Sequence, residues 1–536
     1  MEQLLEKMNP WGTMKKYLIL LMLLLILPLQ MEARRSRTAV KVADNSGREF
    51  RGTWIQTAFQ ERYQKMSPEQ ARKFLTRMVE DLDAAGFNAI LFQVRPEGDA
   101  FYSSSIEPWS RFLTGRQGQA PSPEWDPMEF MIQLCHQHAM EFHAWINPYR
   151  MSASKTLQLA QNHLYYQHPE WFVRFDDKLY LNPGLPECRS YVREVVRDIV
   201  ARYDIDAIHI DDYFYPYPVA GKTFDDRAAF EAYAPVFGFD VASPQALGDF
   251  RRRNVDILIK SLHDDIHTMK PWVRFGVSPF GIYRNQKSWA EGSATNGTQC
   301  YDDLYADVLL WARNGWIDYV IPQLYWEIGH KAADYSTLVK WWNEAVPATC
   351  HLYIGQSIER SLDPKDVAKK SADLTKSHQH FGQKLSEARA CGKVLGNCFW
   401  YAYQVEDNAY HAREYLQDVV WQGGCLPPAY SMLDDKRPSS VKEVKTELTA
   451  QGVQLSWTFP ETADPLQQSC YFCIYRFAKG EKSDVKDASH LIGKTTDSCF
   501  LDTSALESTK YTYAITAVDL CNNESQPVKK SVKIKK

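Results

Sequence analysis

The amino-acid sequence predicts an α/β fold, a (β/α)8 TIM barrel, followed by a small all-β immunoglobulin-like sandwich. Two patterns support this prediction. From residue 50 to about residue 422, short apolar or aromatic runs alternate with polar loops and helical stretches, which is typical of parallel βα units. Around Pro427-Pro428 the helical period ends, and after Arg437-Pro438 apolar residues alternate with polar ones, which is typical of antiparallel strands.

Eight β-branched or aromatic runs in the first region are candidate barrel strands, and eight is the strand number of a TIM barrel. In order, the runs cover residues 51–55, 89–94, 141–146, 207–210, 274–277, 319–321, 351–354 and 397–400. Helices are expected over residues 68–85, 128–138, 188–203, 244–269, 301–314 and 335–345. Two of them open with Ser67-Pro68 and Ser243-Pro244, a capping residue followed by the residue favoured at the first helical position.

The domain boundaries follow from where these patterns change. We predict a barrel over residues 49–428, a linker over 429–437 and an all-β domain over 438–536. Strands are expected there at 453–457, 471–476 and 511–519. Because this domain has its own alternating pattern, its deletion is expected to leave the barrel folded.

The amino-terminal segment has the pattern of a secretory signal. An apolar run over residues 17–29 follows Lys15-Lys16 and is too short to span a bilayer. We predict a signal peptide over residues 1–33, with Met14 as an alternative start, and a linker over 34–48. This predicts a periplasmic or secreted protein.

Composition excludes several function classes. The 62 basic and 66 acidic side chains leave a net charge of −4, without the basic excess of a nucleic-acid-binding protein. The sequence has no ligand spacing typical of a metal site, no glycine-rich phosphate loop and no Gly-x-Ser-x-Gly motif. We therefore expect no metal, no cofactor, no nucleic-acid partner and no membrane contact beyond the signal peptide, whereas the oligomeric state stays open.

Carboxylates follow three of the predicted strands, where the site of a TIM barrel lies. A pair of carboxylates can cleave a glycosidic bond, one attacking or activating water and one protonating the leaving oxygen. Asp211 and Glu327 are the leading pair, with Glu97 as the rival catalytic carboxylate. Asp212 is expected to face away from Asp211 or to lie on the loop. Each of these four carboxylates also fits a structural role. The two aspartates could form a turn after the strand, Glu327 could be a solvated loop residue, and Glu97 could form a salt bridge with Arg95 that braces its loop.

Polar and aromatic residues that suit sugar recognition follow the same strands. Amides and hydroxyls can bind sugar hydroxyl groups, and aromatic rings can stack on sugar faces, although each residue also fits a packing role. His209 shares a strand face with Asp211, because the two are two residues apart. The predicted substrate-binding residues are Arg95, Asn147, His209, Tyr213, Gln323, Tyr325, Trp326, Trp400 and Tyr401.

Six segments of the barrel region are similar to a known family. They are EFRGTW (49–54), FQVRP (92–96), WINPY (145–149), HIDDYFYP (209–216), SPFG (278–281) and PQLYW (322–326). On these motifs the region resembles the glycosyl hydrolase-like family 10 of exported bacterial proteins. The carboxyl-terminal region resembles a fibronectin type III module. The first resemblance implies a TIM-barrel hydrolase that acts on a polysaccharide, with a preference for peptidoglycan glycan strands, and it supports Asp211 by motif position.

Three functions remain in competition at this point. The leading hypothesis is an exported glycoside hydrolase that uses Asp211 with Glu327 or Glu97 as the acid. The second is a carbohydrate-binding protein with a degenerate hydrolase barrel, and the third is a metal-dependent amidase or deacetylase. The sugar, the linkage and the stereochemical outcome stay open, because the outcome depends on the separation of the two carboxyl groups.

Overall fold

A computed structural model describes residues 47–154, 156, 158–362, 374–421, 423–506 and 509–534. The predicted signal peptide and most of the first linker lie outside this range. No helix in the described part of the chain is long and apolar enough to cross a membrane.

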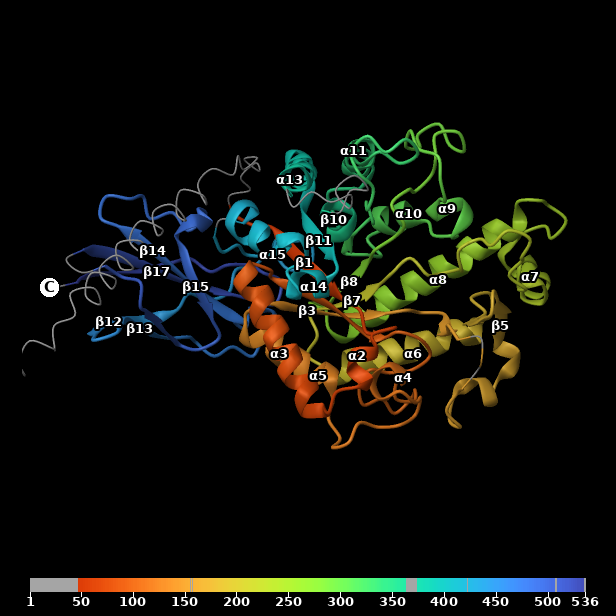
Figure 1. The fold of residues 1–536 in the computed structure, drawn as a ribbon, viewed down its shortest axis with the longest axis horizontal. Helices are drawn as coiled ribbons and strands as arrows, with labels where there is room; N and C mark the ends of the chain where they lie inside the picture. Colours follow the sequence, from red (N-terminus) through yellow and green to blue (C-terminus); the bar gives the residue numbers. More distant parts are fainter. Residues whose placement is uncertain are drawn as a thin grey trace, which may run out of the picture.

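Eight parallel strands close into a barrel (Figure 1). They are β1 (Phe50–Ile55), β2 (Ala89–Arg95), β3 (Glu141–Ile146), β7 (Ala207–Ile210), β8 (Arg274–Val277), β9 (Tyr319–Val320), β10 (His351–Ser357) and β11 (Val394–Trp400). The first strand pairs with both β2 and β11, which completes the ring. These are the eight strands that the sequence predicts, so the TIM-barrel prediction is confirmed.

Large side chains fill the barrel interior. Trp54 of β1 donates a hydrogen bond to His209 of β7 (3.3 Å), and the Phe50 ring of β1 stacks on Tyr353 of β10. These strands are not neighbours in the ring, so their side chains can meet only inside it. We call the carboxyl-terminal end of the strands the barrel mouth and the amino-terminal end the barrel floor.

Helices surround the barrel, and their ends correct two predictions. The helix of residues 68–85 begins at a capping box between Ser67 and Gln70, as predicted. The next predicted Ser-Pro start is wrong: α8 begins at Ala246, because the Ser243 hydroxyl bonds to the Gln245 side chain instead of capping the helix. The predicted helix over residues 301–314 is two short helices, interrupted where Tyr305 has a positive φ of 56°.

The described helices complete the outer layer. The α-helices are α2 (Glu61–Gln64), α3 (Pro68–Ala85), α4 (Arg111–Thr114), α5 (Pro127–Gln137), α6 (Pro186–Arg202), α7 (Arg227–Tyr233), α8 (Ala246–Met269), α9 (Cys300–Asp303), α10 (Val308–Arg313), α11 (Tyr335–Ala345), α12 (Ile358–Leu362), α13 (Thr375–Ala390), α14 (Ala402–Glu406) and α15 (Ala412–Tyr415). Short 3-10 or π turns are η1 (Leu164–Tyr166), η2 (Pro169–Trp171), η3 (Pro235–Phe237), η4 (Ala409–His411), η5 (Leu416–Val420), η6 (Pro465–Gln467) and η7 (Ala488–His490). An unpredicted antiparallel sheet of β4 (Arg150–Ser152), β6 (Lys178–Leu181) and β5 (Phe172–Phe175) follows β3.

The carboxyl-terminal domain is all-β, as predicted. It has a three-stranded sheet of β12 (Lys442–Thr449), β13 (Gly452–Thr458) and β16 (Cys499–Asp502), and a four-stranded sheet of β15 (Leu491–Thr495), β14 (Tyr471–Ala478), β17 (Lys510–Val518) and β18 (Val528–Lys533). Side chains from both sheets, including Leu455, Trp457, Ile474 and Tyr513, form one apolar core. The narrower resemblance to fibronectin type III stays a prediction.

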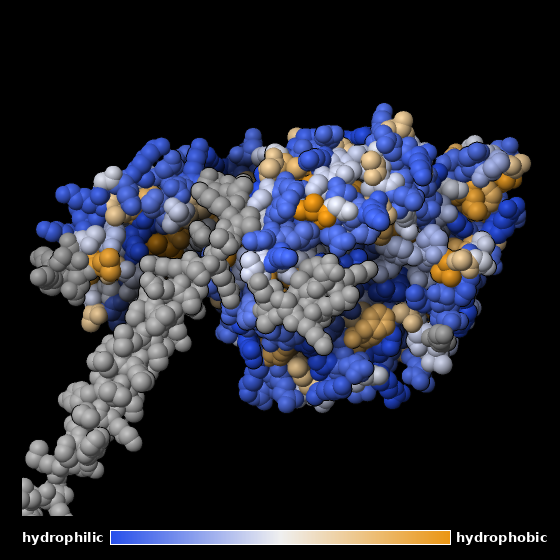
Figure 2. Space-filling model, turned by 45° about the horizontal axis from the view of Figure 1, so that its top comes forward, coloured by the Kyte–Doolittle hydropathy of each residue, from blue (hydrophilic) through white to orange (hydrophobic). Residues whose placement is uncertain are grey.

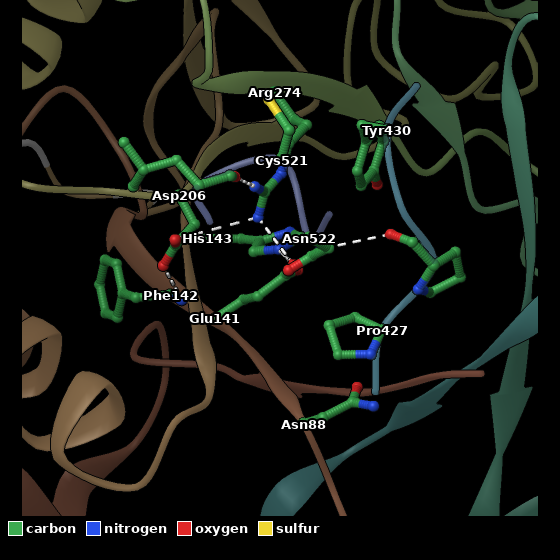
Figure 3. Close-up of polar contacts among 12 residues, drawn as sticks. Asn88, Glu141, Phe142, His143, Asp206, Arg274, Pro427, Tyr430, Cys521 and Asn522 are labelled. Atoms are coloured by element: carbon green, nitrogen blue, oxygen red, sulfur yellow. Dashed lines mark hydrogen bonds and ion pairs between the residues drawn. The ribbon is translucent and has the colours of Figure 1, made fainter. Parts of the chain in front are cut away.

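This domain is docked on the barrel floor. Arg274 at the start of β8 donates to the Leu520 carbonyl (2.8 Å), and Asn522 Nδ2 donates to Glu141 at the start of β3 (2.7 Å) (Figure 3). The Tyr430 N–H of the linker donates to the Cys521 carbonyl (2.9 Å). The barrel mouth is therefore at the end of the barrel away from the second domain.

The molecular surface is polar where Figure 2 shows it, with only small, separate hydrophobic spots among the coloured residues. Isolated apolar side chains of this kind are normal on a folded protein. The bulk of the apolar surface is buried in the barrel, between barrel and helices, and in the β domain.

Candidate active site at the barrel mouth

Two consecutive buried aspartates, Asp211 and Asp212, follow β7 at the barrel mouth. Asp211 is 4% exposed and accepts hydrogen bonds from Trp145 Nε1 (3.1 Å) and Asn147 Nδ2 (3.4 Å). These donors lie at the end of β3, which pairs with β7 in register, so the two strand ends lie side by side. The structure thus places Asn147, a predicted binding residue, directly against the predicted catalytic carboxyl group.

The surroundings of Asp211 favour its protonated form. Burial, with the neighbouring charge of Asp212, raises the pKa of Asp211 to about 7, and the Arg150 charge and the Trp145 hydrogen bond oppose this rise. A carboxyl group with such a pKa is partly protonated at neutral pH. It can therefore both donate and accept a proton during a reaction.

Asp212 lies on the loop after β7, which ends at Ile210. Of the two placements that the sequence left open, the loop is the observed one. Burial raises the pKa of Asp212, but hydrogen bonds from the Tyr217 hydroxyl and the Gln323 amide stabilise its charged form. The predicted binding residue Gln323 therefore lies against the second carboxyl group.

Arg150 is a site residue that the sequence analysis missed. Its charge lowers the pKa of both aspartates, and its guanidinium lies 5.0 Å from the centre of the Tyr213 ring. It is fixed by a hydrogen bond to the Pro96 carbonyl (2.9 Å). The available signal was its position in the polar run that follows β3 and ends at Arg150; of that run, only Asn147 was predicted to bind substrate. Trp145, inside the WINPY segment, and Tyr217, directly after the HIDDYFYP segment, were not predicted as site residues either.

His209 lies inside the barrel and is fully buried. The Trp54 N–H donates to its Nε2 atom (3.3 Å), so Nε2 is an acceptor, and Nδ1–H donates to the Tyr319 hydroxyl (3.1 Å). Burial holds the pKa of His209 well below its usual range. The ring is therefore neutral, and its partners are barrel side chains, among them Ser278 (2.9 Å), and not Asp211.

Aromatic rings surround the aspartate pair. Half-buried Trp400 lies 6.1 Å from Trp145 and 5.1 Å from Tyr401, measured between ring centres. Trp326 packs edge-on against Phe280 (5.4 Å). The Tyr325 hydroxyl lies in the field of Asp212 and Tyr213. The structure thus gathers the predicted aromatic residues Tyr213, Tyr325, Trp326, Trp400 and Tyr401 from the ends of β7, β9 and β11.

The predicted pairing of Arg95 with Glu97 is wrong. Arg95 is fully buried and forms a two-point ion pair with Glu107 (2.6 and 2.7 Å), whereas Glu97 pairs with Arg111 (3.1 Å). A fully buried guanidinium needs an equally buried planar partner, and the loop after β2 brings Glu107 back to supply it. These pairs brace that loop.

Glu327 is exposed and lies on the α13 side of the mouth. Its charge acts on Lys384 and His380 of that helix. In the described part of the chain no contact joins Glu327 to either aspartate. The structure therefore does not bring the predicted Asp211–Glu327 pair together by direct contact.

No group of three or more histidine, cysteine, aspartate or glutamate side chains in the described residues is arranged to hold a metal ion. That the site uses no metal or cofactor stays a prediction.

The sequence is similar to curated hydrolases along most of its length. Residues 49–372 match the family model described as glycosyl hydrolase-like 10. The chain is 35% identical over 499 residues to glycosyl hydrolase YngK of Bacillus subtilis, which covers 91% of this chain and 94% of that protein. It is 34% identical over 343 residues to glycosyl hydrolase DigH of Escherichia coli K12, which covers 60% of this chain and 76% of that protein.

Solved structures are more distant. An α-L-fucosidase from Paenibacillus thiaminolyticus aligns with a TM-score of 0.43 and 12% identity, covering 68% of this chain and 49% of that chain. An endo-1,4-β-mannanase from Rhizomucor miehei aligns with a TM-score of 0.42 and 11% identity, covering 72% of this chain and 98% of that chain.

Proposed function

Because the chain belongs to the glycosyl hydrolase-like 10 family, we propose that it is a glycoside hydrolase whose reacting centre is the Asp211–Asp212 pair. The observation that carries this proposal is the unequal environment of the two carboxyl groups. Burial and the neighbouring Asp212 charge raise the pKa of Asp211 to about 7, whereas for Asp212 burial also raises the pKa but hydrogen bonds from Tyr217 and Gln323 oppose that rise. Pairs of titratable groups with different environments are typical of acid and base roles.

In the proposed reaction Asp211 is the acid. It gives its proton to the glycosidic oxygen while the bond between that oxygen and the anomeric carbon breaks. The Asp212 carboxylate stabilises the positive charge that develops on the sugar, held in place by Tyr217 and Gln323. Water then adds to the anomeric carbon and loses a proton to the ionised Asp211, which restores the starting state.

The proposed substrate is a polysaccharide, with peptidoglycan glycan strands as the first candidate, and the proposed location is periplasmic or secreted. The half-buried rings of Trp326, Trp400 and Tyr401 support a glycan, because flat aromatic faces pack well on sugar rings. Asn147 and Gln323 support it as well, since amides bind hydroxyl groups.

A panel of glycans, including peptide-free peptidoglycan strands, tests the proposal. The purified protein is incubated with each glycan, and products are identified by mass spectrometry. We expect shortened glycan chains from at least one substrate and none with the Asp211→Asn variant. If no glycan in the panel is cleaved, the proposed activity is rejected.

The same variant separates the hydrolase from a non-catalytic glycan-binding protein. A catalytic group acts mainly in the transition state, so Asp211→Asn should abolish cleavage and leave glycan affinity nearly unchanged. Binding without cleavage by the wild-type protein would favour the binding-protein alternative.

A further inference from the structure

An exposed phenylalanine, Phe59, lies at the rim of the barrel mouth. It is in the loop that follows β1, which ends at Ile55, so it is at the same end of the barrel as the aspartate pair. Its side chain is 56% exposed, and its ring packs edge-on against the buried Phe112 ring, with 5.2 Å between the ring centres. Phe112 belongs to α4, in the loop that follows β2. Both rings therefore come from loops of the mouth.

The backbone at Phe59 has a conformation that disfavours a side chain. Its φ is 60°, in the left-handed region, where the Cβ atom of an L-residue crowds the backbone. Phe59 is the third residue of a turn in which the Gln60 N–H donates to the Thr57 carbonyl (3.3 Å). Glycine or asparagine is favoured where the third residue of a turn has a positive φ. A phenylalanine at this position therefore costs folding free energy.

Burial of the Phe59 ring offsets little of that cost, because more than half of the side chain stays in water. An exposed apolar side chain is ordinary by itself. Its combination with backbone strain is not ordinary, and retained strain is typical of ligand-binding sites. Phe59 is thus a candidate contact for a ligand at the mouth.

The loop that carries Phe59 is fixed by Gln93 at the end of β2. The Gln93 Oε1 atom accepts the N–H groups of Thr57 (3.0 Å) and Ala58 (2.8 Å), and the Gln93 carbonyl accepts the Thr57 hydroxyl (2.8 Å). Gln93 itself is buried. These bonds hold the strained turn in one conformation, so a ligand that contacts the ring does not first have to order the loop.

The same loop adjoins the aromatic residues that surround the aspartates. The Tyr403 hydroxyl donates to the Gln56 carbonyl (2.7 Å), and the Tyr403 ring lies 5.4 Å from the Tyr401 ring. Strands β7, β3, β2 and β1 follow one another around the barrel. Three spacings of roughly 4.8 Å between neighbouring strands place the Phe59 loop about 15 Å along the rim from Asp211. The ring can therefore contact the far part of a long ligand that is bound at the aspartates.

We propose that Phe59 stacks on a sugar residue remote from the cleaved bond, so that the mouth binds a strand of several sugars. The inference rests on the proposed function and adds that the substrate is a long glycan strand. A phenyl ring supplies the flat apolar surface on which a sugar face can pack.

Binding is measured by calorimetric titration in the Asp211→Asn variant, the parent of all further variants, which prevents cleavage. The probes are a disaccharide and an octasaccharide of peptide-free peptidoglycan. Phe59→Ala should weaken octasaccharide binding roughly fivefold, whereas Phe59→Tyr, which keeps the ring, should bind it as the parent does. Disaccharide affinity should not change, because a disaccharide bound at the aspartates is too short to reach Phe59. Leu448→Ala, at an exposed apolar residue of the second domain, is the matched control and should change neither affinity.

Melting temperatures test the strain at Phe59. Phe59→Gly and Phe59→Ala both lack the ring, but only alanine keeps a Cβ atom at a positive φ, so the glycine variant should melt at the higher temperature. Both variants should bind the octasaccharide equally weakly, because both lack the stacking surface.

Three results would overturn the proposal. If Phe59→Ala keeps the parent's octasaccharide affinity, or loses disaccharide affinity to the same extent, Phe59 is not a remote contact, although the proposed hydrolase activity stands. Equal melting temperatures of the alanine and glycine variants would remove the strain on which the proposal rests. If the parent binds neither probe, peptidoglycan is not the substrate, and that part of the proposed function fails together with this inference.

Discussion

At the scale of single residues, the burial of Asp211 is the property from which the chemistry of the site follows. A carboxyl group placed between Trp145 and Asn147 loses much of its hydration, and the adjacent Asp212 adds negative charge. Both effects oppose ionisation, so the group keeps a proton near neutral pH at the expense of folding stability.

The kinetic prediction is that Asp211→Asn lowers kcat by roughly 10²–10⁴-fold, because an amide cannot protonate the leaving oxygen. The sequence places Asp212 facing away from Asp211 or on the loop, and on that basis Asp212→Asn is expected to have the smaller effect on the chemical step. Since Asp212 shares the mouth, we now expect both variants to lose most activity. Asp240→Asn, at an exposed aspartate, is the control and should keep wild-type rates. Near-normal kcat in Asp211→Asn would show that the acid lies elsewhere.

The stability prediction concerns pH. The folded pKa of Asp211 is about 7 against an ordinary value of 3.8, so the folded state binds more protons than the unfolded state between these values. This group therefore reduces stability as pH rises from about 4 to 7. Replacement by Asn removes that loss.

Thermal unfolding of Asp211→Asn and wild type at pH 4 and pH 8 checks this. The melting temperature of the variant minus that of wild type should be larger at pH 8 than at pH 4. For Asp240→Asn this difference should be the same at both pH values. An equal difference at both pH values would contradict the raised pKa.

At the scale of elements, the loop between β2 and α5 depends on a buried ion pair. Arg95 and Glu107 are both fully buried, and Tyr191 donates a further hydrogen bond to Glu107 (3.0 Å). Removing one partner leaves an uncompensated charge in the interior, which costs much more than the pair itself contributes.

We expect Glu107→Gln to lower the free energy of unfolding by about 3–5 kcal/mol. The matched change Glu97→Gln should cost less, because its partner Arg111 is 29% exposed and can be hydrated. Urea denaturation of both variants gives the comparison. If both variants lose the same free energy of unfolding, then the burial of Arg95 does not make the loss of its partner more costly.

At the scale of the whole molecule, the barrel floor is completed by the second domain. Cys521 and Tyr430 are fully buried in the same cluster as the barrel side chains Phe50 and Tyr353. The Tyr430 hydroxyl also bonds to the Tyr353 hydroxyl (2.7 Å). The two domains thus share one core at their junction.

These contacts reverse the expectation that the barrel folds without residues 438–536. Truncation would expose Glu141, Arg274 and the floor of the barrel, so we expect the truncated chain to lose cooperative unfolding.

In the full chain, Asn522→Ala should lower the free energy of unfolding by about 2 kcal/mol, because a hydrogen bond to the charged Glu141 is lost. Asn296→Ala, at an exposed asparagine, is the control. Calorimetry of the full chain, the two variants and the truncated chain gives the comparison. If the barrel of the truncated chain unfolds in the same cooperative transition as in the full chain, the barrel folds without residues 438–536 after all.

The sequence by itself determined the barrel. The strand runs are short, apolar and followed by polar loops, and that local pattern is enough to place β3, β7 and β8 to the residue. It also placed Asp211 and Asn147 at strand ends, because the carboxyl ends of all parallel strands in a barrel meet at one mouth.

Only the tertiary structure decided which charges meet. Arg95 is two residues from Glu97 but pairs with Glu107, and Arg150, the first residue of β4, lies over the Tyr213 ring where its charge acts on both aspartates. The docking of Asn522 on Glu141 joins residues 381 positions apart. Strand patterns are local and repeat every two residues, whereas pairing in a buried site depends on where loops return, which no local pattern specifies.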